Sequence, residues 1–306
     1  MTAPAGVWVP ILSRALTFAG TVVGAALFVH VLLGLVPGDA IDTLPNGDAL
    51  RPLLAAEWGL DQPLPRRILT ASLRAFSGEL GTSLTTRPGA AVSGLILAAA
   101  PSSLMLVFTA SLAGLAATIA TLLTAKRFPF VLPITSFLTA IPVALAALMA
   151  VNGINAITFE LVDADRIPRP EWFALPGQDS PFRTALAVGL LACFSSQLGN
   201  LATRTTGVGA DLATAGFVIA EQARGGPVGL LLARHLAVPV LRALSAGVPS
   251  MLSSLIVVER SFGLGGCGAL FWTAVRERDW PLAAALAAAA ALLVAGIRLC
   301  VDIFAV

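Results

Sequence analysis

The chain has 306 residues, of which 57% are apolar and 12% are charged, and its mean hydropathy is +0.88. Because the charged fraction is about half of that in soluble domains, the composition excludes an ordinary soluble enzyme and a disordered chain. A net charge of +2 without any long basic run excludes a nucleic-acid partner. Three widely spaced cysteines indicate structural thiols, not a disulfide framework; they are Cys193, Cys267 and Cys300. The composition predicts an all-α membrane protein.

Six windows without charged residues predict six membrane-spanning helices, because about 20 apolar residues in a helix cross a bilayer. Two windows are longer than one crossing, so we expect the second span to begin near Pro101 and the third to end near Asn152. The fifth window is short, and Pro239 and Pro249 indicate that its helix is bent or begins late. The windows are residues 15–38, 88–125, 128–159, 184–203, 243–258 and 280–297.

The distribution of Lys and Arg predicts that both termini lie in the cytoplasm. This orientation places eight basic and three acidic residues inside, and eleven basic and fourteen acidic residues outside. The short turn at Lys126 and Arg127 is the best single anchor for the orientation. We therefore expect one membrane domain, residues 1–306, with an outer segment at 39–100 and a cytoplasmic loop at 204–242.

Two groups of large apolar residues in the outer segment recur at helical spacing and predict two amphipathic helices. The first group is Leu50, Leu53, Leu54 and Trp58, and the second is Ile68, Leu69, Leu73 and Phe76. Each helix needs a partner for its apolar face, either this chain's own membrane helices or a protein that arrives from outside. We expect these helices to form an ordered cap between the first two spans.

No motif in the sequence supports catalysis or a cofactor bound by this chain. Gly263 to Gly268 match G-x-G-x-x-G, but they are expected to follow a membrane helix instead of a strand, so we interpret them as a bend at the membrane surface. A P-loop needs Gly-Lys-Ser/Thr, and the single lysine, Lys126, follows an alanine. His30 and His235 lie too far apart for a metalloprotease motif. We therefore expect the chain not to be an enzyme.

Ionisable groups inside the bilayer would be the default sites of ion-coupled transport. Within the predicted spans only His30 is ionisable, and it lies towards the outer end of the first span. A neutral imidazole near the lipid headgroups and a gating or proton-transfer group both fit this position. The absence of carboxylates from the predicted interior counts against a carrier driven by an ion gradient.

The longest cytoplasmic segment predicts a helix at residues 211–223, an interruption at Gly225-Gly226-Pro227 and a second helix that contains Leu230, Leu231 and Leu232. Gly225 is expected to allow a sharp turn after the first helix. This helix–turn–helix could cap the membrane bundle, or it could dock into a groove on a soluble partner. The residues alone leave both alternatives open.

Several segments in order resemble the first of the two membrane permeases in ABC importers of peptides, opines and nickel. Residues 217–225, with Arg234, His235 and Pro239, are similar to the family's coupling loop. The other similar segments are Pro37-Gly38-Asp39, residues 59–65, residues 78–83, residues 100–104 and residues 258–268. The resemblance runs from about residue 10 to the C-terminus.

The resemblance implies a multi-pass permease in the bacterial cytoplasmic membrane that imports a peptide-like solute; nickel or opine import by the same machinery is the alternative. It implies four kinds of partner: a second permease, two ATPase subunits that bind ATP and Mg, a periplasmic or lipid-anchored solute-binding protein, and the bilayer. The implied ATPase-coupling residues are Glu221, Ala223, Arg224, Gly225 and His235. Candidates for the outer gate or path are His30, Glu259, Gly263 and Gly266.

Two other classes of function remain open at this stage. A free-standing carrier or channel would use an ion gradient and is expected to have interior carboxylates. A structural membrane subunit would assemble with other membrane proteins without any ATPase. The set of proteins that purify with the chain distinguishes all three classes.

Overall fold

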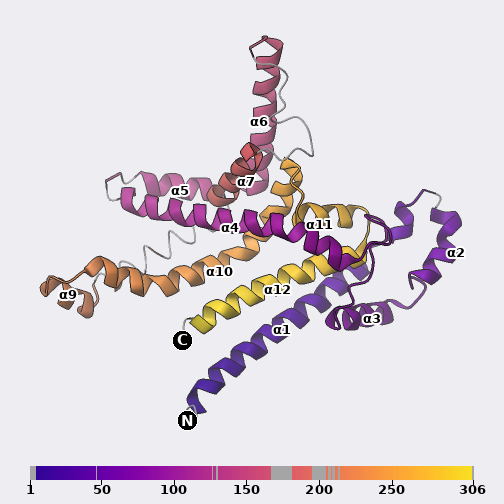
Figure 1. Ribbon diagram of the computed structural model, residues 1–306, viewed down its shortest axis with the longest axis horizontal. Helices are drawn as coiled ribbons and strands as arrows, with labels where there is room; N and C mark the ends of the chain where they lie inside the picture. The colour runs from indigo at the N-terminus through magenta and orange to yellow at the C-terminus, as the bar shows by residue number, and fades with distance from the viewer. Residues whose placement is uncertain are drawn as a thin grey trace. The chain divides into compact units, whose positions relative to one another are not determined.

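The computed structural model describes residues 5–45, 47–125, 127–128, 130–166, 181–194, 205, 208, 211–212 and 214–304. In these residues the regular structure is helical, as predicted, and extended backbone pairs at an isolated bridge between Thr82 and Ala91. The elements are α1 (Ala5–Leu35), η1 (Ala40–Thr43), α2 (Gly47–Glu57), α3 (Leu64–Phe76), α4 (Val92–Ala125), α5 (Val131–Ala140), α6 (Val143–Asp163), α7 (Pro181–Phe194), α9 (Gly216–Ala223), α10 (Val228–Phe262), α11 (Cys267–Arg276) and α12 (Trp280–Phe304), shown in Figure 1.

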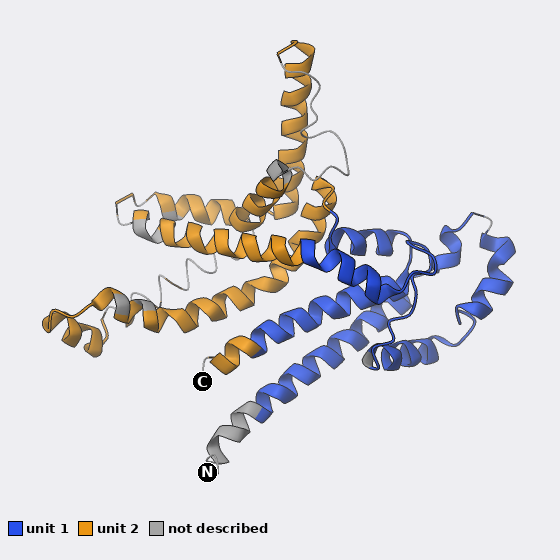
Figure 2. Ribbon diagram, viewed as in Figure 1, with its two compact units in different colours: residues 1–102, 265–299 blue, residues 103–264, 300–306 orange. Residues whose placement is uncertain are grey.

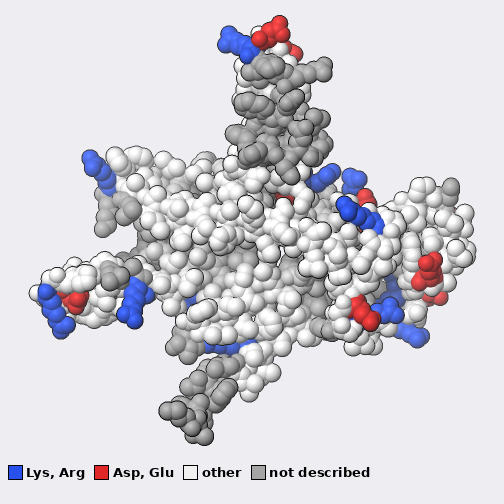
Figure 3. All heavy atoms as spheres, in the orientation of Figure 1, with Lys and Arg blue, Asp and Glu red and all other residues white. Residues whose placement is uncertain are grey.

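Five of the described helices are long and apolar enough to cross a membrane, which confirms a multi-pass membrane protein. On the face in Figure 3, charged side chains gather around the end of α6, around α9 and around α2 and α3. The predicted window at 184–203 is described only to Phe194, and this part forms the shorter apolar helix Thr184–Phe194. Lys126, on which the predicted orientation depends most, lies outside the described residues. The five helices are Leu12–Leu35, Val92–Thr121, Val143–Asp163, Arg234–Phe262 and Trp280–Phe304.

The third predicted window contains a candidate span, but its predicted bounds are wrong, because the chain breaks at Ile141 into α5 and α6. Ile141 has φ −77° and ψ 125°, an extended conformation, because a residue that precedes proline is disfavoured in the helical region. The candidate span is α6, which continues past Asn152 to Asp163. The helix of the second predicted span, α4, begins at Val92 and contains Pro101, and the start of the crossing near that proline stays a prediction.

The helix α10 differs from the prediction as well, because one continuous helix of 35 residues replaces the expected second loop helix and separate fifth span. It begins at Val228 and runs through both Pro239 and Pro249. Each proline removes one backbone hydrogen bond, and a long helix retains its ladder on both sides of such a gap. The end of the predicted loop at 204–242 and the candidate span Arg234–Phe262 therefore share one helix.

The chain divides into two compact units, each described here by itself, and Figure 2 colours them separately. Unit 1 comprises residues 1–102 and 265–299. Its buried core joins the start of α4 to α11 and α12, through Val92, Ala274, Leu282 and Ala283, which are all fully buried. The helix α3 packs against α1. That both units form one membrane domain stays a prediction.

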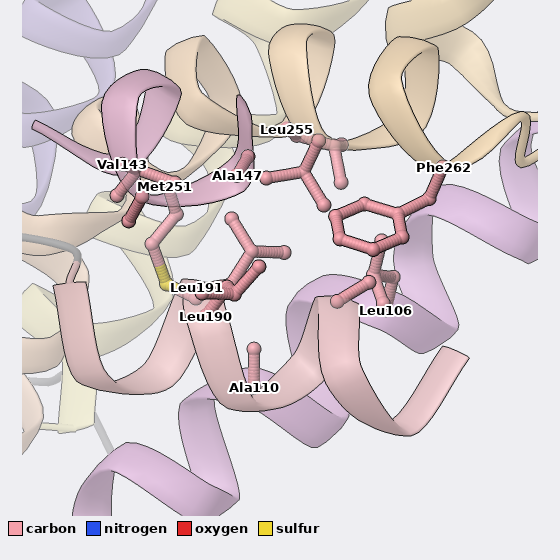
Figure 4. Close-up of a cluster of buried hydrophobic side chains, with 12 residues drawn as sticks. Leu106, Ala110, Val143, Ala147, Leu190, Leu191, Met251, Leu255 and Phe262 are labelled. Atoms are coloured by element: carbon pink, nitrogen blue, oxygen red, sulfur yellow. The ribbon is translucent and has the colours of Figure 1, made fainter. Parts of the chain in front are cut away.

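Unit 2 comprises residues 103–264 and 300–306. Its core gathers apolar side chains from α4, α6, α7 and α10, which point toward one another in Figure 4. Leu191 of α7 and Met251 of α10 are fully buried at its centre. The helix α10 packs against both α6 and α7. This core holds the second half of α10, the helix that begins at Val228 after the turn at Gly225.

The outer segment contains the two predicted helices, α2 and α3. Their apolar faces are covered only in part, because the side chains of Leu53, Leu69 and Leu73 are 68%, 57% and 59% exposed. The contact of α3 with α1 uses Leu64 and Ile68 beside Gly34. Of the two partners considered for these apolar faces, this chain's own membrane helices therefore do not cover these three leucines.

Candidate functional site

The helix α9 ends in a turn that glycine makes possible. Gly225 has φ +70°, which confirms the predicted sharp turn. The Gly226 N–H donates to the Glu221 carbonyl at 3.0 Å, and the Gly225 N–H donates to the Gln222 carbonyl at 3.0 Å. This pair of bonds is a Schellman motif, which satisfies the last carbonyls of the helix and fixes the direction in which the chain leaves it. The turn therefore has one defined shape.

A ring stack joins α9 to the first part of α10. The rings of Phe217 and His235 lie 4.8 Å apart at 30° to each other. His235 donates its Nδ1–H to the Leu231 carbonyl at 2.8 Å, which orients the imidazole. Val218 of α9 is buried, and the two helices pack against each other. The ring stack and the packing thus hold α9 against the first part of α10.

The remaining predicted coupling residues lie on the surface of this element. Ala223, Arg224 and Gly225 are exposed. Glu221 and Arg224 do not form an ion pair with each other. The side-chain carboxylate of Glu221 lies against the turn, because a Cβ added at Gly226 would be 2.0 Å from its Oε1. Gly226 is a site residue that sequence reasoning missed, although the Gly-Gly pair marks it. Four of the five predicted coupling residues therefore lie at this one turn: Glu221, Ala223, Arg224 and Gly225.

Glu259 is fully buried near the end of α10, where no interior carboxylate was expected. The Ser103 hydroxyl of α4 donates to its Oε1 at 2.6 Å. The predicted fifth window ended at residue 258 because a charged residue follows it. The helix α10 continues to Phe262, so it includes Glu259. A carboxylate buried among membrane helices needs such a partner, because an unpaired buried charge is costly. The hydrogen bond joins α4 to α10.

Two glycines of the G-x-G-x-x-G match lie at helix ends, which agrees with the predicted bend of the chain, and the position of the bend at the membrane surface stays a prediction. Gly263 has φ +67° and ends α10, and the Leu264 N–H donates to the Glu259 carbonyl at 2.8 Å. Gly266 has an extended backbone and precedes the first turn of α11. A helix and not a strand precedes these glycines, so they lack the context of a dinucleotide site.

His30 is half-buried in α1, and its Nδ1–H donates to the Ala26 carbonyl at 2.8 Å. Its ring lines a cavity of about 640 Å³ that lies within unit 1. The carbonyl bond fixes the tautomer and leaves Nε2 as the available nitrogen. The structure therefore places His30 beside a cavity, in a different unit from Glu259.

The acidic residues after α1 form an ion-pair network that sequence reasoning missed. Asp39 and Asp42 cap η1 reciprocally, and Arg51 pairs with both carboxylates. Arg278 Nη1 lies 2.7 Å from Asp42 Oδ2. The Asp39 N–H bond lowers the pKa of Asp42 from its ordinary value of 3.8, and the two arginines lower it further. Gly38, at φ +89°, lets the Arg278 guanidinium approach the backbone.

A second missed feature is the fully buried carboxylate of Asp279, which precedes α12. Its Oδ2 accepts the Ser83 hydroxyl and the backbone N–H groups of Leu84, Thr85 and Thr86, the last three at 3.1, 3.3 and 3.2 Å. Successive N–H groups of this kind make a nest for an anion. The sequence motif that ends at Ser83 therefore anchors the outer segment to the start of α12.

Comparison with known proteins identifies relatives along nearly the whole chain. No established family profile matches the sequence. The chain is 24% identical to the oligopeptide transport system permease protein AppB of Bacillus subtilis over 96% of its length and 95% of the relative. It is 28% identical to the glutathione transport system permease protein GsiC of Salmonella paratyphi A and of Salmonella typhimurium, over 89% of the chain and 88% of each relative. The predicted resemblance is confirmed: the chain is a relative of the membrane permeases of peptide transport systems.

Proposed function

We propose that this chain is one of two permease subunits in an ATP-driven ABC importer of a peptide-like solute. The observation that carries the proposal is the similarity to peptide and glutathione transport permeases over 89–96% of the chain. ATP and Mg are bound and hydrolysed by two partner subunits, and this chain supplies half of the path. A solute-binding protein delivers the solute from outside.

The element made of α9 and its turn is the contact for an ATPase subunit. Phe217 and Ile219 are 45% and 54% exposed, so α9 presents apolar side chains that fit the helix-in-groove mode of docking. Arg224 and Ala223 lie exposed at the end of the helix beside the turn. This arrangement favours docking over the alternative in which the loop only caps the bundle.

Motion of α9 reaches the other end of the permease through α10. This helix has 35 residues and is about 52 Å long at 1.5 Å per residue. Its first part is stacked on α9 at His235, and its last turns carry Glu259, which is bonded to Ser103 of α4. Closure of the ATPases therefore displaces the contact between α10 and α4, with Gly263 as the point where the chain leaves the helix. We assign Glu259 and Gly263 to the outer gate.

The topology that fits this role has six spans with both termini in the cytoplasm of a bacterium and the outer segment on the opposite side. Accessible cysteines test it in a variant that lacks the three native ones. We expect an impermeant thiol reagent to label Ser77→Cys, in the exposed end of the cap, in intact cells. Gln222→Cys, exposed on α9, should react only after the cells are opened. Labelling in the reverse order would overturn the topology.

The subunit assignment is tested by affinity purification of the tagged chain from its native membranes, followed by uptake assays in vesicles. We expect a second permease and two ATPase subunits to purify with it, and peptide uptake to require hydrolysable ATP. A functional complex that contains only copies of this chain, or one with membrane partners and no ATPase, would contradict the proposal. Competition among di- and tripeptides, an opine and nickel then identifies the solute.

Glu259 favours one second candidate, a carrier driven by a proton gradient, because buried carboxylates commonly relay protons in such proteins. The two functions differ under an uncoupler, which collapses the gradient and leaves added ATP intact. Uptake by the importer should continue in vesicles supplied with ATP, and uptake by a proton-driven carrier should stop. The Glu259→Gln variant retains a hydrogen-bond acceptor for Ser103 and should still support uptake by the importer.

A further inference from the structure

The cavity beside His30 is large enough for a small molecule, and its lining combines arginines with apolar residues. Its volume is about 640 Å³, within the range of small-molecule sites, and every lining residue belongs to unit 1. Part of the lining comes from α1 and α12, and the rest comes from α3 and the segments on either side of it. Figure 1 shows α3 beside the end of α1.

Positive charge lines the α3 wall. Arg66, Arg67 and Arg74 all line the cavity, and none of them forms an ion pair within the described part of the chain. The two arginines of the neighbouring network, Arg51 and Arg278, do have acidic partners. Two glutamates also line the cavity, so its formal charge is positive by one. Arginine side chains that lack partners beside a cavity favour a ligand with an anionic group such as phosphate.

Apart from His30, the lining from α1 and α12 is mainly apolar, and both helices are candidate membrane spans. It includes Leu33 of α1 and Ala284 and Ala288 of α12. Trp280 lies at the start of α12, where this wall begins, and tryptophan is enriched at the level of lipid headgroups. A ligand that fits both walls needs an anionic head beside an apolar chain.

The position of α3 sets the height of the cavity relative to the membrane. Leu64 and Ile68 of α3 pack beside Gly34, at the last turn of α1, so α3 lies where that span leaves the bilayer. On another side of α3, Leu69 and Leu73 are 57% and 59% exposed. A helix with charged residues and exposed leucines at this level is typical of one that lies in the membrane interface.

We propose that this cavity binds one anionic phospholipid, with its phosphate beside Arg67 and Arg74 and an acyl chain along Ala284 and Ala288. Basic pockets between membrane helices bind lipid head groups by the same combination of charge and apolar surface. The site holds α3 against α1 and so couples the cap to the lipid of the membrane. It does not depend on the coupling role of α9.

The test is a binding titration of the full-length chain in mild detergent by native mass spectrometry, with three probes: phosphatidylglycerol, phosphatidylcholine and glycerol 3-phosphate. We expect phosphatidylglycerol to bind about tenfold or more tightly than phosphatidylcholine. The double variant Arg67→Gln/Arg74→Gln should lose most of this preference. The matched control, Arg87→Gln/Arg276→Gln, removes two exposed arginines that do not line the cavity and should keep it.

Two further measurements locate the ligand and distinguish its source. Ala288→Phe fills part of the apolar wall and should weaken phosphatidylglycerol without changing the affinity for glycerol 3-phosphate. A photoactivatable phosphatidylglycerol should label wild-type residues 280–288, a result that does not depend on a folded variant. Equal affinities for the two lipids, or labelling only outside the cavity, would overturn the proposal. Glycerol 3-phosphate that binds as tightly as phosphatidylglycerol would assign the cavity to a soluble anion.

Discussion

Replacement of Gly225 by valine is the sharpest test of the turn that follows α9. Gly225 has φ +70°, and a Cβ built there meets no atom within 4 Å, so the cost of valine is conformational and not steric. A residue with a Cβ in the left-handed region costs about 1–2 kcal/mol, and a β-branched residue is a marked outlier there. That penalty lowers the population of the turn by roughly 5- to 30-fold relative to other conformations.

The variant should therefore be inserted and should bind its ATPases weakly or in the wrong geometry. The assay measures solute uptake and ATP hydrolysis of the whole complex in vesicles. We expect uptake to fall about 5- to 30-fold, in line with the population of the turn, and hydrolysis to fall less. Gly225→Asn should recover part of the uptake, because asparagine tolerates a positive φ better than other residues.

Gly229→Val is the matched control for this experiment. Gly229 is exposed near the start of α10, and a Cβ there also meets nothing within 4 Å, but its backbone is helical. Valine at this position should leave uptake close to wild type. Normal uptake by Gly225→Val with all subunits bound would refute the coupling role of the turn. An equal loss of uptake in both variants would show that the size of the side chain, and not the backbone conformation, causes the loss.

Three other predictions concern the outer segment. Asp279→Ala leaves buried donors without an acceptor and should lower the unfolding free energy by about 1–3 kcal/mol, seen as a lower midpoint in thermal unfolding; an unchanged midpoint would contradict the anchoring role. Gly38→Ala places a Cβ 1.9 Å from Arg278 Nη1 and should open the ion-pair network, detectable as faster proteolysis of the cap. Because the pKa of Asp42 is lowered in the folded state, its stabilisation is present above pH 3.8 and lost as the pH falls through the folded value. Asp42→Asn should remove that part of the acid dependence, measured by thermal unfolding at several pH values.

Charge and local sequence predicted the features that depend on neighbours in the chain. The helical cap, the turn at Gly225 and the helix ends at Gly263 and Gly266 all follow from residue type and spacing. The break at Ile141 also has a local cause, its following proline, and was missed because only the absence of charge was used to define the third span.

The missed parts of the site depend on residues far apart in the sequence. Glu259 was placed outside the predicted fifth span because the charge-free window ends at Val258, and its partner, Ser103, is 156 residues away, so only the fold brings the two together. Asp279 and Ser83 are 196 residues apart, and both look like ordinary surface polar residues in the sequence. Burial of a carboxylate requires donors, and donors at such separations leave no local pattern.

The contact between Ser83 and Asp279 can form only after both residues have been synthesised, which determines when the cap is completed. The N–H nest at Leu84, Thr85 and Thr86 is synthesised early, whereas the carboxylate that fills it belongs to Asp279, 196 residues after Ser83. A nascent chain therefore carries an incomplete cap until Asp279 and the start of α12 have been synthesised and have reached the same side. Closure of this contact therefore requires the helices between Ser83 and Asp279 to have been synthesised and placed, so this anchor of the cap forms late in folding.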